Sequence, residues 1–242
     1  MKRKNIGVIG CGRWGKVIIK ELNKISNIKF IYNSKDDYKK ISENIDWIFI
    51  LTPDKTHYKI AKHFLEKKIN VFCEKPLTID FKKADYLINL SKKLKTNLYV
   101  DDVEIYKKKH IKINNKINNI VRTKKDLGTA KSLLNRLAYH DFYLIFQPKD
   151  LNMIKYIEAN TKKKILKIKI TLQNKTIFNF LYDIGSNKKK HFINKIRMDK
   201  FTNNPVKDML KTVLYKKNNF KKNNINALTS IKLINKVRDI LK

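Results

Sequence analysis

The chain has 242 residues, of which 42% are hydrophobic, enough to bury one large domain or two smaller ones, and disorder is excluded as the default. Its formal net charge of +35 suggests a nucleic-acid binder, but only 6 of the 56 basic residues are arginine, the side chain that such proteins favour. Because lysine is accompanied by abundant Asn and Ile along the whole chain, we interpret the charge as a compositional bias that attracts anionic ligands. We expect no specific nucleic-acid partner.

Three further features of the sequence restrict its class. No stretch of about eighteen uncharged apolar residues exists, so no membrane span is expected. The apolar run near the amino terminus stops at Gly10 and is too short for a signal peptide. Cys11 and Cys73 are the only cysteines, which excludes a disulfide framework and suits a reducing cytosol. The histidines have no metal-ligand spacing, so we expect a cytoplasmic protein without a metal site.

The first part of the chain alternates apolar bursts with amphipathic runs. Strands are expected at 5–10, 28–32, 46–51, 69–74 and 97–103. Helices are expected at 13–25, 55–67 and 81–94, with a candidate short helix at 35–44. Near-continuous apolar strands separated by helices indicate a parallel sheet buried on both faces. We therefore predict an α/β, doubly wound domain over residues 1–103, in which one strand is short or missing between residues 32 and 46.

The pattern changes in the second part of the chain, residues 104–242. A polar segment at 107–127 precedes a helical period at 130–146. Antiparallel strands are expected at 163–172, 175–185 and 190–198, and helices at 204–216 and 226–242. We predict a second, α+β domain with an antiparallel sheet.

A glycine-rich turn follows the first expected strand. The residues from Gly10 to Gly15 form the pattern G-x-G-x-x-G, with Arg13 and Trp14 before the last glycine. In this context Gly10 permits a tight turn, Gly12 lets the backbone approach a pyrophosphate, and Gly15 allows helix and strand to pack closely. The N–H groups at the helix start then face the anion. We predict a dinucleotide site here, the alternative being an ordinary strand–helix turn.

The end of the second strand bears on the choice of dinucleotide. An acidic residue at this position would accept a hydrogen bond from the ribose 2′-hydroxyl of NAD, but the chain has Asn33, Ser34 and Lys35. A hydroxyl and a cation suit the 2′-phosphate of NADP, which we favour slightly. Alternatively, Asp36 or Asp37 serves NAD and the lysine is only solvated.

Three segments together resemble a known family. They are "GCGRWGK" near the start, "LTPDKTHYKIAKHFLEKKINVFCEKPL" at 51–77 and "NPVKDMLKTVL" near the end. The combination resembles the Gfo/Idh/MocA family of NAD(P)-dependent oxidoreductases, in particular members that act on sugars and nucleotide sugars. The resemblance implies a Rossmann domain, a shortened substrate domain, and a homo-oligomer formed through the open face of the second-domain sheet.

The resemblance also implies roles for two motifs. Thr52, Pro53 and His57 match a segment on the nicotinamide side of the cofactor, and Glu74 belongs to the Glu-Lys-Pro motif. The lysine of that motif, Lys75, lies in the family beside the nicotinamide and the reacting carbon.

The position of Lys75 agrees with this role on physical grounds. It comes at the carboxyl end of a central parallel strand, where open α/β sheets bind ligands. A lysine there donates to a substrate hydroxyl and stabilises the alkoxide that develops as hydride leaves. The alternative is a surface lysine paired with Glu74.

A second catalytic residue is expected from the substrate domain. In the family a histidine in an Asp-x-x-x-His arrangement completes the site, and His140, followed by Asp141, fits it. The position four residues earlier is Arg136, which would lower the pKa of His140. His140 then acts as a neutral acid/base, or the site has lost its acid/base pair, or Arg136 binds an anionic substrate group. Tyr139 and Asp141 are further candidates for substrate contact.

The sequence therefore supports two main hypotheses. The first is hydride transfer between NAD(P)(H) and a hydroxyl or keto carbon of a sugar or nucleotide sugar. The second is a catalytically impaired, dinucleotide-binding relative that acts as a sensor or a partner subunit.

Overall fold

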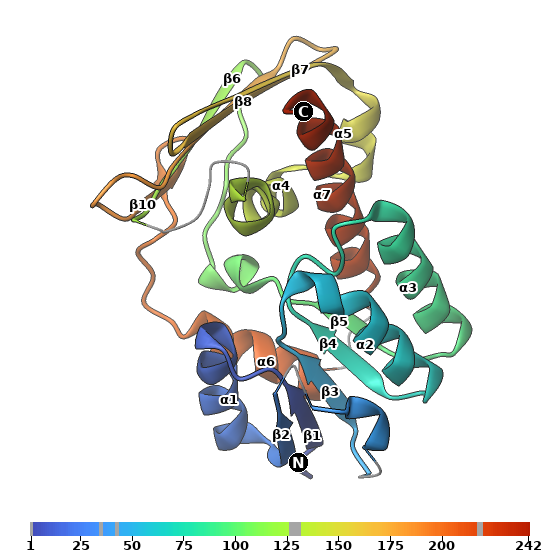
Figure 1. The fold of residues 1–242 in the computed structure, drawn as a ribbon. Coiled ribbons are helices and arrows are strands. Elements are labelled where there is room, and N and C mark those ends of the chain that lie inside the picture. Colours follow the sequence, from blue (N-terminus) through green and yellow to red (C-terminus); the bar gives the residue numbers. More distant parts are fainter. Residues whose placement is uncertain (1, 34–35, 42–43, 126–131, 217–219) are drawn as a thin grey trace. The chain divides into compact units, whose positions relative to one another are not determined.

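The computed structural model shows two compact units (Figure 1). It describes residues 2–33, 36–41, 44–125, 132–216 and 220–242. The first unit comprises Met1–Tyr106 and Asn204–Leu228, and the second comprises Lys107–Asn203 and Thr229–Lys242. The predicted division after residue 103 assigned 104–106 and 204–228 to the second domain, whereas the structure groups both segments with the first unit.

The first unit is built on a parallel sheet of five strands in the order β2-β1-β3-β4-β5. The strands are β1 (Asn5–Ile9), β2 (Asn27–Tyr32), β3 (Trp47–Ile50), β4 (Asn70–Cys73) and β5 (Leu98–Val100). The connecting helices are α1 (Arg13–Ile25), α2 (Asp54–Glu66) and α3 (Phe81–Lys93), with a 3-10 turn η1 at Tyr38–Lys40. The predicted α/β, doubly wound fold is confirmed. The strand order reverses between β1 and β3, and such a switch point is where open sheets bind ligands.

Helix α6 (Pro205–Tyr215) brings a late segment of the chain back to the first unit (Figure 1). Its apolar residues Met209, Leu210 and Val213 join Ile18 and Leu22 of α1 in one buried core over the sheet. Burial of this apolar stripe explains why a segment more than a hundred residues after β5 packs here.

The start of α7 (Lys221–Ile240) covers the edge of the same sheet. The Asn223 amide donates to Val100 O and accepts from Val100 N, both at 2.8 Å. Phe220 packs edge-on against Trp47 and Tyr99. The side chain of Asn223 thereby occupies hydrogen-bonding groups that an edge strand would otherwise expose.

The second unit contains a six-stranded sheet in the order β11-β10-β6-β9-β8-β7. Its strands are β6 (Ile117–Thr123), β7 (Ile154–Lys162), β8 (Ile165–Leu172), β9 (Ile177–Asp183), β10 (Lys190–Ile193) and β11 (Ile196–Arg197). The expected strands are confirmed as β8 to β11. The sheet is mixed rather than wholly antiparallel, because β6 pairs with β9 in parallel.

The sequence prediction missed strands β6 and β7, and both have a physical reason. On the inner side of β6 only Ile120 is an apolar buried residue, and its buried neighbour Asn118 is satisfied by hydrogen bonds to Asn114 and Asn194. Strand β7 lies at the sheet edge and is largely exposed. Neither strand therefore has the apolar alternation that identifies a half-buried strand.

One face of this sheet is covered by helices. The predicted helix at 130–146 appears as a π-helical turn, η3 (Leu134–Ala138), continued by α4 (Tyr139–Ile145), while residues 126–131 lie outside the described part. Phe142 and Phe146 of this region pack against Phe180 and Phe178 of β9. Shorter helices, 3-10 turn η2 (Val103–Lys107) and α5 (Pro148–Asn152), complete the elements.

The other face of the second-unit sheet is open and mixed in character. Asn179 donates to Asn119 at 3.0 Å, and Lys169 pairs with Glu158 at 3.1 Å. The expected homo-oligomer through this face stays a prediction.

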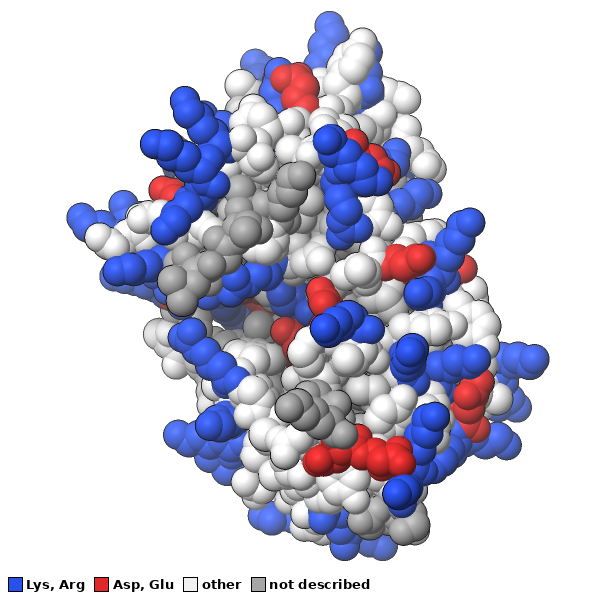
Figure 2. Space-filling view, in the orientation of Figure 1, with Lys and Arg blue, Asp and Glu red and all other residues white. Residues whose placement is uncertain are grey.

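The surface charge is spread widely. Figure 2 shows lysine and arginine side chains scattered over the visible face, with acidic side chains among them. This distribution agrees with a compositional bias and marks no single basic patch on that face. Within the part of the chain that the structure describes, no helix is both long and apolar enough to span a membrane.

Candidate functional site

The glycine turn connects β1 to α1 at the carboxyl edge of the first sheet. Gly10 has φ +102°, and its N–H donates to Tyr32 O at 2.7 Å. A Cβ at Gly10 would lie 2.6 Å from the Leu51 carbonyl, and one at Gly15 would lie 2.6 Å from Gly10 O. Glycine at positions 10 and 15 is therefore required by the fold itself.

Gly12 differs from these two glycines. It is the N-cap of α1, makes no side-chain cap bond, and a Cβ built on it would meet nothing within 4 Å. Open space thus lies directly in front of the first turn of α1, whose N–H groups favour an anion. The residues of this turn fit a dinucleotide pyrophosphate, which would fill the space at Gly12.

This contrast between glycines yields a first prediction. We expect Gly12→Ala to leave the free energy of unfolding within about 0.5 kcal/mol of wild type, because the methyl group meets no protein atom. The same methyl group would obstruct a pyrophosphate, so the Kd for NADH or NADPH should rise at least about tenfold. Gly15→Ala serves as the matched control and should lower the melting temperature. Unchanged cofactor affinity in Gly12→Ala would contradict the assignment of the turn.

The end of β2 carries the residues that were expected to select the cofactor. Asn33 accepts from the Cys11 thiol at 2.8 Å, and its backbone N–H donates to Asp36 at 2.6 Å. Ser34 and Lys35 lie outside the described residues. The first hydrogen bond connects Asn33 to the glycine turn, and the second holds the Asp36 carboxylate against the backbone of the turn that contains it.

His57 links two loops at the carboxyl edge of the sheet. It is 1% exposed, with Nε2 2.7 Å from Thr52 O and Nδ1 2.9 Å from Pro76 O. Burial lowers the pKa of His57, and the neutral ring has one N–H to donate. Pro53 is the N-cap of α2. His57 thus holds the loop after β3 to the loop after β4, and we infer that it positions the cofactor site through these loops.

The Glu-Lys-Pro motif follows β4 directly. Glu74 N donates to Ile50 O at 2.8 Å, which continues the pairing of β3 and β4. The Glu74 carboxylate accepts from Lys75 N, and the Lys75–Pro76 peptide is cis. Lys75 is partly buried at the carboxyl end of a central strand, as the sequence predicts.

Asp101 is a site residue that the sequence analysis missed. It follows β5, is 2% exposed, and accepts from Trp14 Nε1 at 2.7 Å and from Val103 N at 3.3 Å. Its hydrogen bond to Trp14 joins the glycine turn to the end of the edge strand. The available signal was a pair of aspartates directly after an apolar strand, in a chain with only 21 acidic residues.

Glu74 and Asp101 are electrostatically coupled. Burial and, after it, the negative charge of Asp101 raise the pKa of Glu74 to about 8. Burial likewise raises the pKa of Asp101 to about 6, opposed by the hydrogen bond from Trp14 and the charge of Lys75. At neutral pH the two carboxyl groups beside Lys75 therefore share about one proton, which resides mainly on Glu74.

The remaining predicted residues belong to the second unit. Arg136 is exposed on η3, and His140 is partly buried in the first turn of α4. Tyr139 and Asp141 are both 0% exposed and point into the core of the unit. The structure therefore places Tyr139 and Asp141 on the packed face of the helix, whereas the sequence suggested substrate contact.

Asp141 belongs to a buried polar cluster that the sequence did not predict. Its Oδ1 lies 2.8 Å from His191 Nε2 and 3.6 Å from Arg122 Nη1. Burial, followed by the charge of Asp141, raises the pKa of Tyr182 well above its usual range. The cluster joins α4 to β6, β9 and β10, directly beside His140 in sequence.

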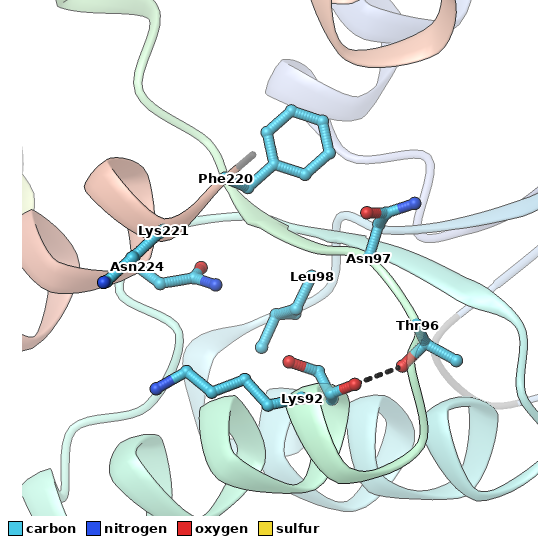
Figure 3. Close-up of a pocket in the computed structure, with 8 residues that line it drawn as sticks. Lys92, Thr96, Asn97, Leu98, Phe220, Lys221 and Asn224 are labelled. Atoms are coloured by element: carbon cyan, nitrogen blue, oxygen red, sulfur yellow. Dashed lines mark hydrogen bonds between the residues drawn. The ribbon is translucent and has the colours of Figure 1, made fainter. Parts of the chain in front are cut away.

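A cavity of about 530 Å³ lies elsewhere in the first unit (Figure 3). Its lining residues are Ser91, Lys92, Thr96, Asn97, Leu98, Phe220, Lys221 and Asn224. Because Leu98 begins β5, this cavity lies at the amino end of the strand, opposite the edge that carries Lys75. It is therefore no part of the candidate site. Among the described residues, no three His, Cys, Asp or Glu side chains gather as metal ligands.

Comparison with known proteins confirms the predicted resemblance. Residues 27–102 match the GFO_IDH_MocA model, described as an oxidoreductase family with an NAD-binding Rossmann fold. Over 93 residues the chain is 29% identical to the uncharacterized oxidoreductase YrbE of Bacillus subtilis, an alignment that covers 30% of this chain and 27% of that protein. The match to this curated relative thus spans about a quarter of its length.

Solved structures resemble the whole chain in fold. A UDP-N-acetylglucosamine 3-dehydrogenase, GnnA from Acidithiobacillus ferrooxidans, has a TM-score of 0.80 at 15% identity, with 100% of this chain and 98% of that chain covered. GenD2 from gentamicin A biosynthesis, solved in complex with NAD, has a TM-score of 0.79 at 10% identity, with 99% and 94% covered. A probable dehydrogenase from Thermotoga maritima has a TM-score of 0.78 at 13% identity, with 98% and 96% covered. At these identities the similarity shows the fold.

Proposed function

We propose that this chain is an NAD(P)-dependent oxidoreductase that transfers a hydride between the nicotinamide and a hydroxyl or keto carbon of a sugar or nucleotide sugar. The observation that carries the proposal is the open space at Gly12, before the first turn of α1, at the same sheet edge as Lys75. The solved relatives named as a sugar-nucleotide dehydrogenase and as an NAD complex support the same class.

In this proposal the first unit binds the cofactor and polarises the substrate. The backbone from Gly10 to Gly15 binds the pyrophosphate, and Asn33 lies toward the adenosine ribose. The residue types that follow it in sequence, Ser34 and Lys35, favour NADP over NAD. The nicotinamide, when bound, accepts or supplies the hydride. Lys75 donates a hydrogen bond to the substrate oxygen and stabilises the negative charge that develops on it.

The second unit supplies the proton in this proposal. His140 takes up the hydroxyl proton during oxidation and returns it during reduction. Arg136 contributes a positive charge for an anionic group of the substrate. The protein works in the cytoplasm as a homo-oligomer formed through the second-unit sheet, without a nucleic-acid partner.

A second candidate function is a dinucleotide-binding sensor or partner subunit with impaired catalysis. The observation that favours it is Arg136, which stands where the family has an aspartate four residues before the histidine. This candidate shares cofactor binding with the first and differs from it in having no turnover.

The deciding experiment is a titration of the purified chain with NADPH and with NADH. We expect saturable binding, detected as energy transfer to the nicotinamide from Trp14, which lies in the glycine turn, and from the buried Trp47. A screen of nucleotide sugars for absorbance change at the nicotinamide band then separates the enzyme from the sensor. Absence of binding to both cofactors in folded protein would overturn both candidates.

A further inference from the structure

Three carboxyl-edge residues of the first unit come together from distant parts of the sequence. Trp14 belongs to the glycine turn, Glu74 follows β4, and Asp101 follows β5. The strand order places β3 and β4 between β1 and β5, so the bond from Trp14 to Asp101 runs across the carboxyl ends of the central strands. The two carboxyl groups therefore lie at the carboxyl edge of the sheet, the same edge as the glycine turn and Lys75.

The reacting ring of the cofactor changes charge in the reaction. An oxidised nicotinamide carries one positive charge, a reduced one carries none, and the rest of the dinucleotide is identical in both forms. A comparison of the two forms therefore cancels the phosphate interactions and the attraction of the basic surface. Only charges near the nicotinamide ring distinguish the forms.

We propose that Glu74 and Asp101 form a redox-form selector, a carboxyl pair that favours the oxidised cofactor when ionised and the reduced cofactor when protonated. The inference rests on the proposed function, because it requires a dinucleotide in the first unit. It assigns a role to Asp101, and it gives Glu74 a charge-dependent role in addition to its contact with Lys75.

The sign of the effect follows from the charges. Both carboxyl groups have a raised pKa, about 8 for Glu74 and about 6 for Asp101, so the pair gains negative charge as pH rises between these values. That charge attracts a cationic ring, so affinity for the oxidised form should rise relative to the reduced form. By linkage, binding of the oxidised form should release protons from the pair.

Other charged groups lie near the pair and contribute to the electrostatic potential around it. They are Lys75 and Asp54 near Glu74, and Lys75, Asp102 and Glu104 near Asp101. A charged lysine opposes the negative charge of the pair, and a charged carboxylate adds to it. None of these groups reverses the predicted direction.

The test measures the ratio of two dissociation constants on the full chain. Kd for the reduced cofactor comes from its fluorescence, and Kd for the oxidised cofactor from competition against it, at about pH 6 and about pH 8.5. We expect the ratio of oxidised to reduced Kd to fall on the order of tenfold across this range. The same probe, NADP(H) or NAD(H), is used in both redox forms.

Two substitutions locate the effect. Asp101→Asn retains an oxygen that accepts from Trp14, and Glu74→Gln retains the shape of the side chain; each should remove a large part of the pH dependence. Glu66→Gln, which neutralises an exposed carboxylate of α2 in the same unit, should leave it unchanged. If one of these two variants does not fold, the pH dependence of the Kd ratio in the other variant still tests the inference.

The outcomes separate this inference from the proposed function. Binding of both forms with a ratio that does not change with pH overturns the selector alone. A pH dependence that persists in both Asp101→Asn and Glu74→Gln also overturns it, because another group is then responsible. Absence of binding in either redox form overturns the proposed function and the selector together.

Discussion

Lys75→Ala is expected to lower turnover by about 10²- to 10³-fold while the Kd for the cofactor stays near its wild-type value. Lys75 lies at the carboxyl end of β4, beyond the glycine turn that binds the pyrophosphate in the proposed function. Its loss removes a donor to the oxygen on which charge develops, an interaction made mainly in the transition state. The measurement is steady-state kinetics with the sugar nucleotide found in the screen, beside the cofactor titration.

Controls separate the role of Lys75 from the effect of net charge. Lys59→Ala removes an exposed lysine of α2 in the same unit and should leave both kcat and Kd unchanged. Wild-type turnover in Lys75→Ala would refute the catalytic assignment. A loss of cofactor affinity equal to the loss of turnover would show instead that Lys75 acts in binding.

The first unit is the part of the chain that its sequence predicts best. Its central strands are short, nearly unbroken apolar runs. In Trp47–Ile50, for example, all four residues are buried, and no surface helix or loop would contain such a run. The glycine pattern was equally informative, because a Cβ at Gly15 would meet Gly10 O within the turn and a Cβ at Gly10 would meet the Leu51 backbone after the neighbouring strand. In the first unit, the strands and the turn expected from the local sequence pattern are the ones found in the fold.

The return of α6 and the link from Trp14 to Asp101 could not be predicted in the same way. Asp101 is functional in our proposal because an indole 87 positions earlier in the sequence donates to it. Nothing in the residues around Asp101 encodes that contact. Likewise, the apolar stripe of α6 predicts that this helix is packed, but not which unit it packs against.

His57 shows that a motif can identify a residue without specifying its contacts. The motif placed it on the nicotinamide side, and the structure places both ring nitrogens against backbone carbonyls. In the structure the buried imidazole joins the loop after β3 to the loop after β4. The sequence cannot distinguish these roles, because both require a histidine at the same spacing.

Asp141→Ala is expected to destabilise the second unit by about 3–5 kcal/mol, the usual cost of removing one member of a buried ion pair. The carboxylate is 0% exposed and lies among Arg122, Tyr182 and His191. Its loss leaves the partly buried Arg122 guanidinium without this counter-charge. Denaturant unfolding followed by circular dichroism measures the loss, and hydrogen exchange at β9 assigns it to the second unit.

Graded substitutions show whether charge or shape is responsible for this stability. Asp141→Asn keeps an acceptor oxygen and should lower the free energy of unfolding less than Asp141→Ala does. Asp239→Ala is the control, because Asp239 is exposed and pairs with Lys242; its free energy of unfolding should stay within about 0.5 kcal/mol of wild type. A cost below about 1 kcal/mol for Asp141→Ala would contradict the buried ion pair. Because Asp141 directly follows His140, a loosened cluster would also displace the proposed acid/base residue, so turnover should fall in Asp141→Asn even where the unit remains folded.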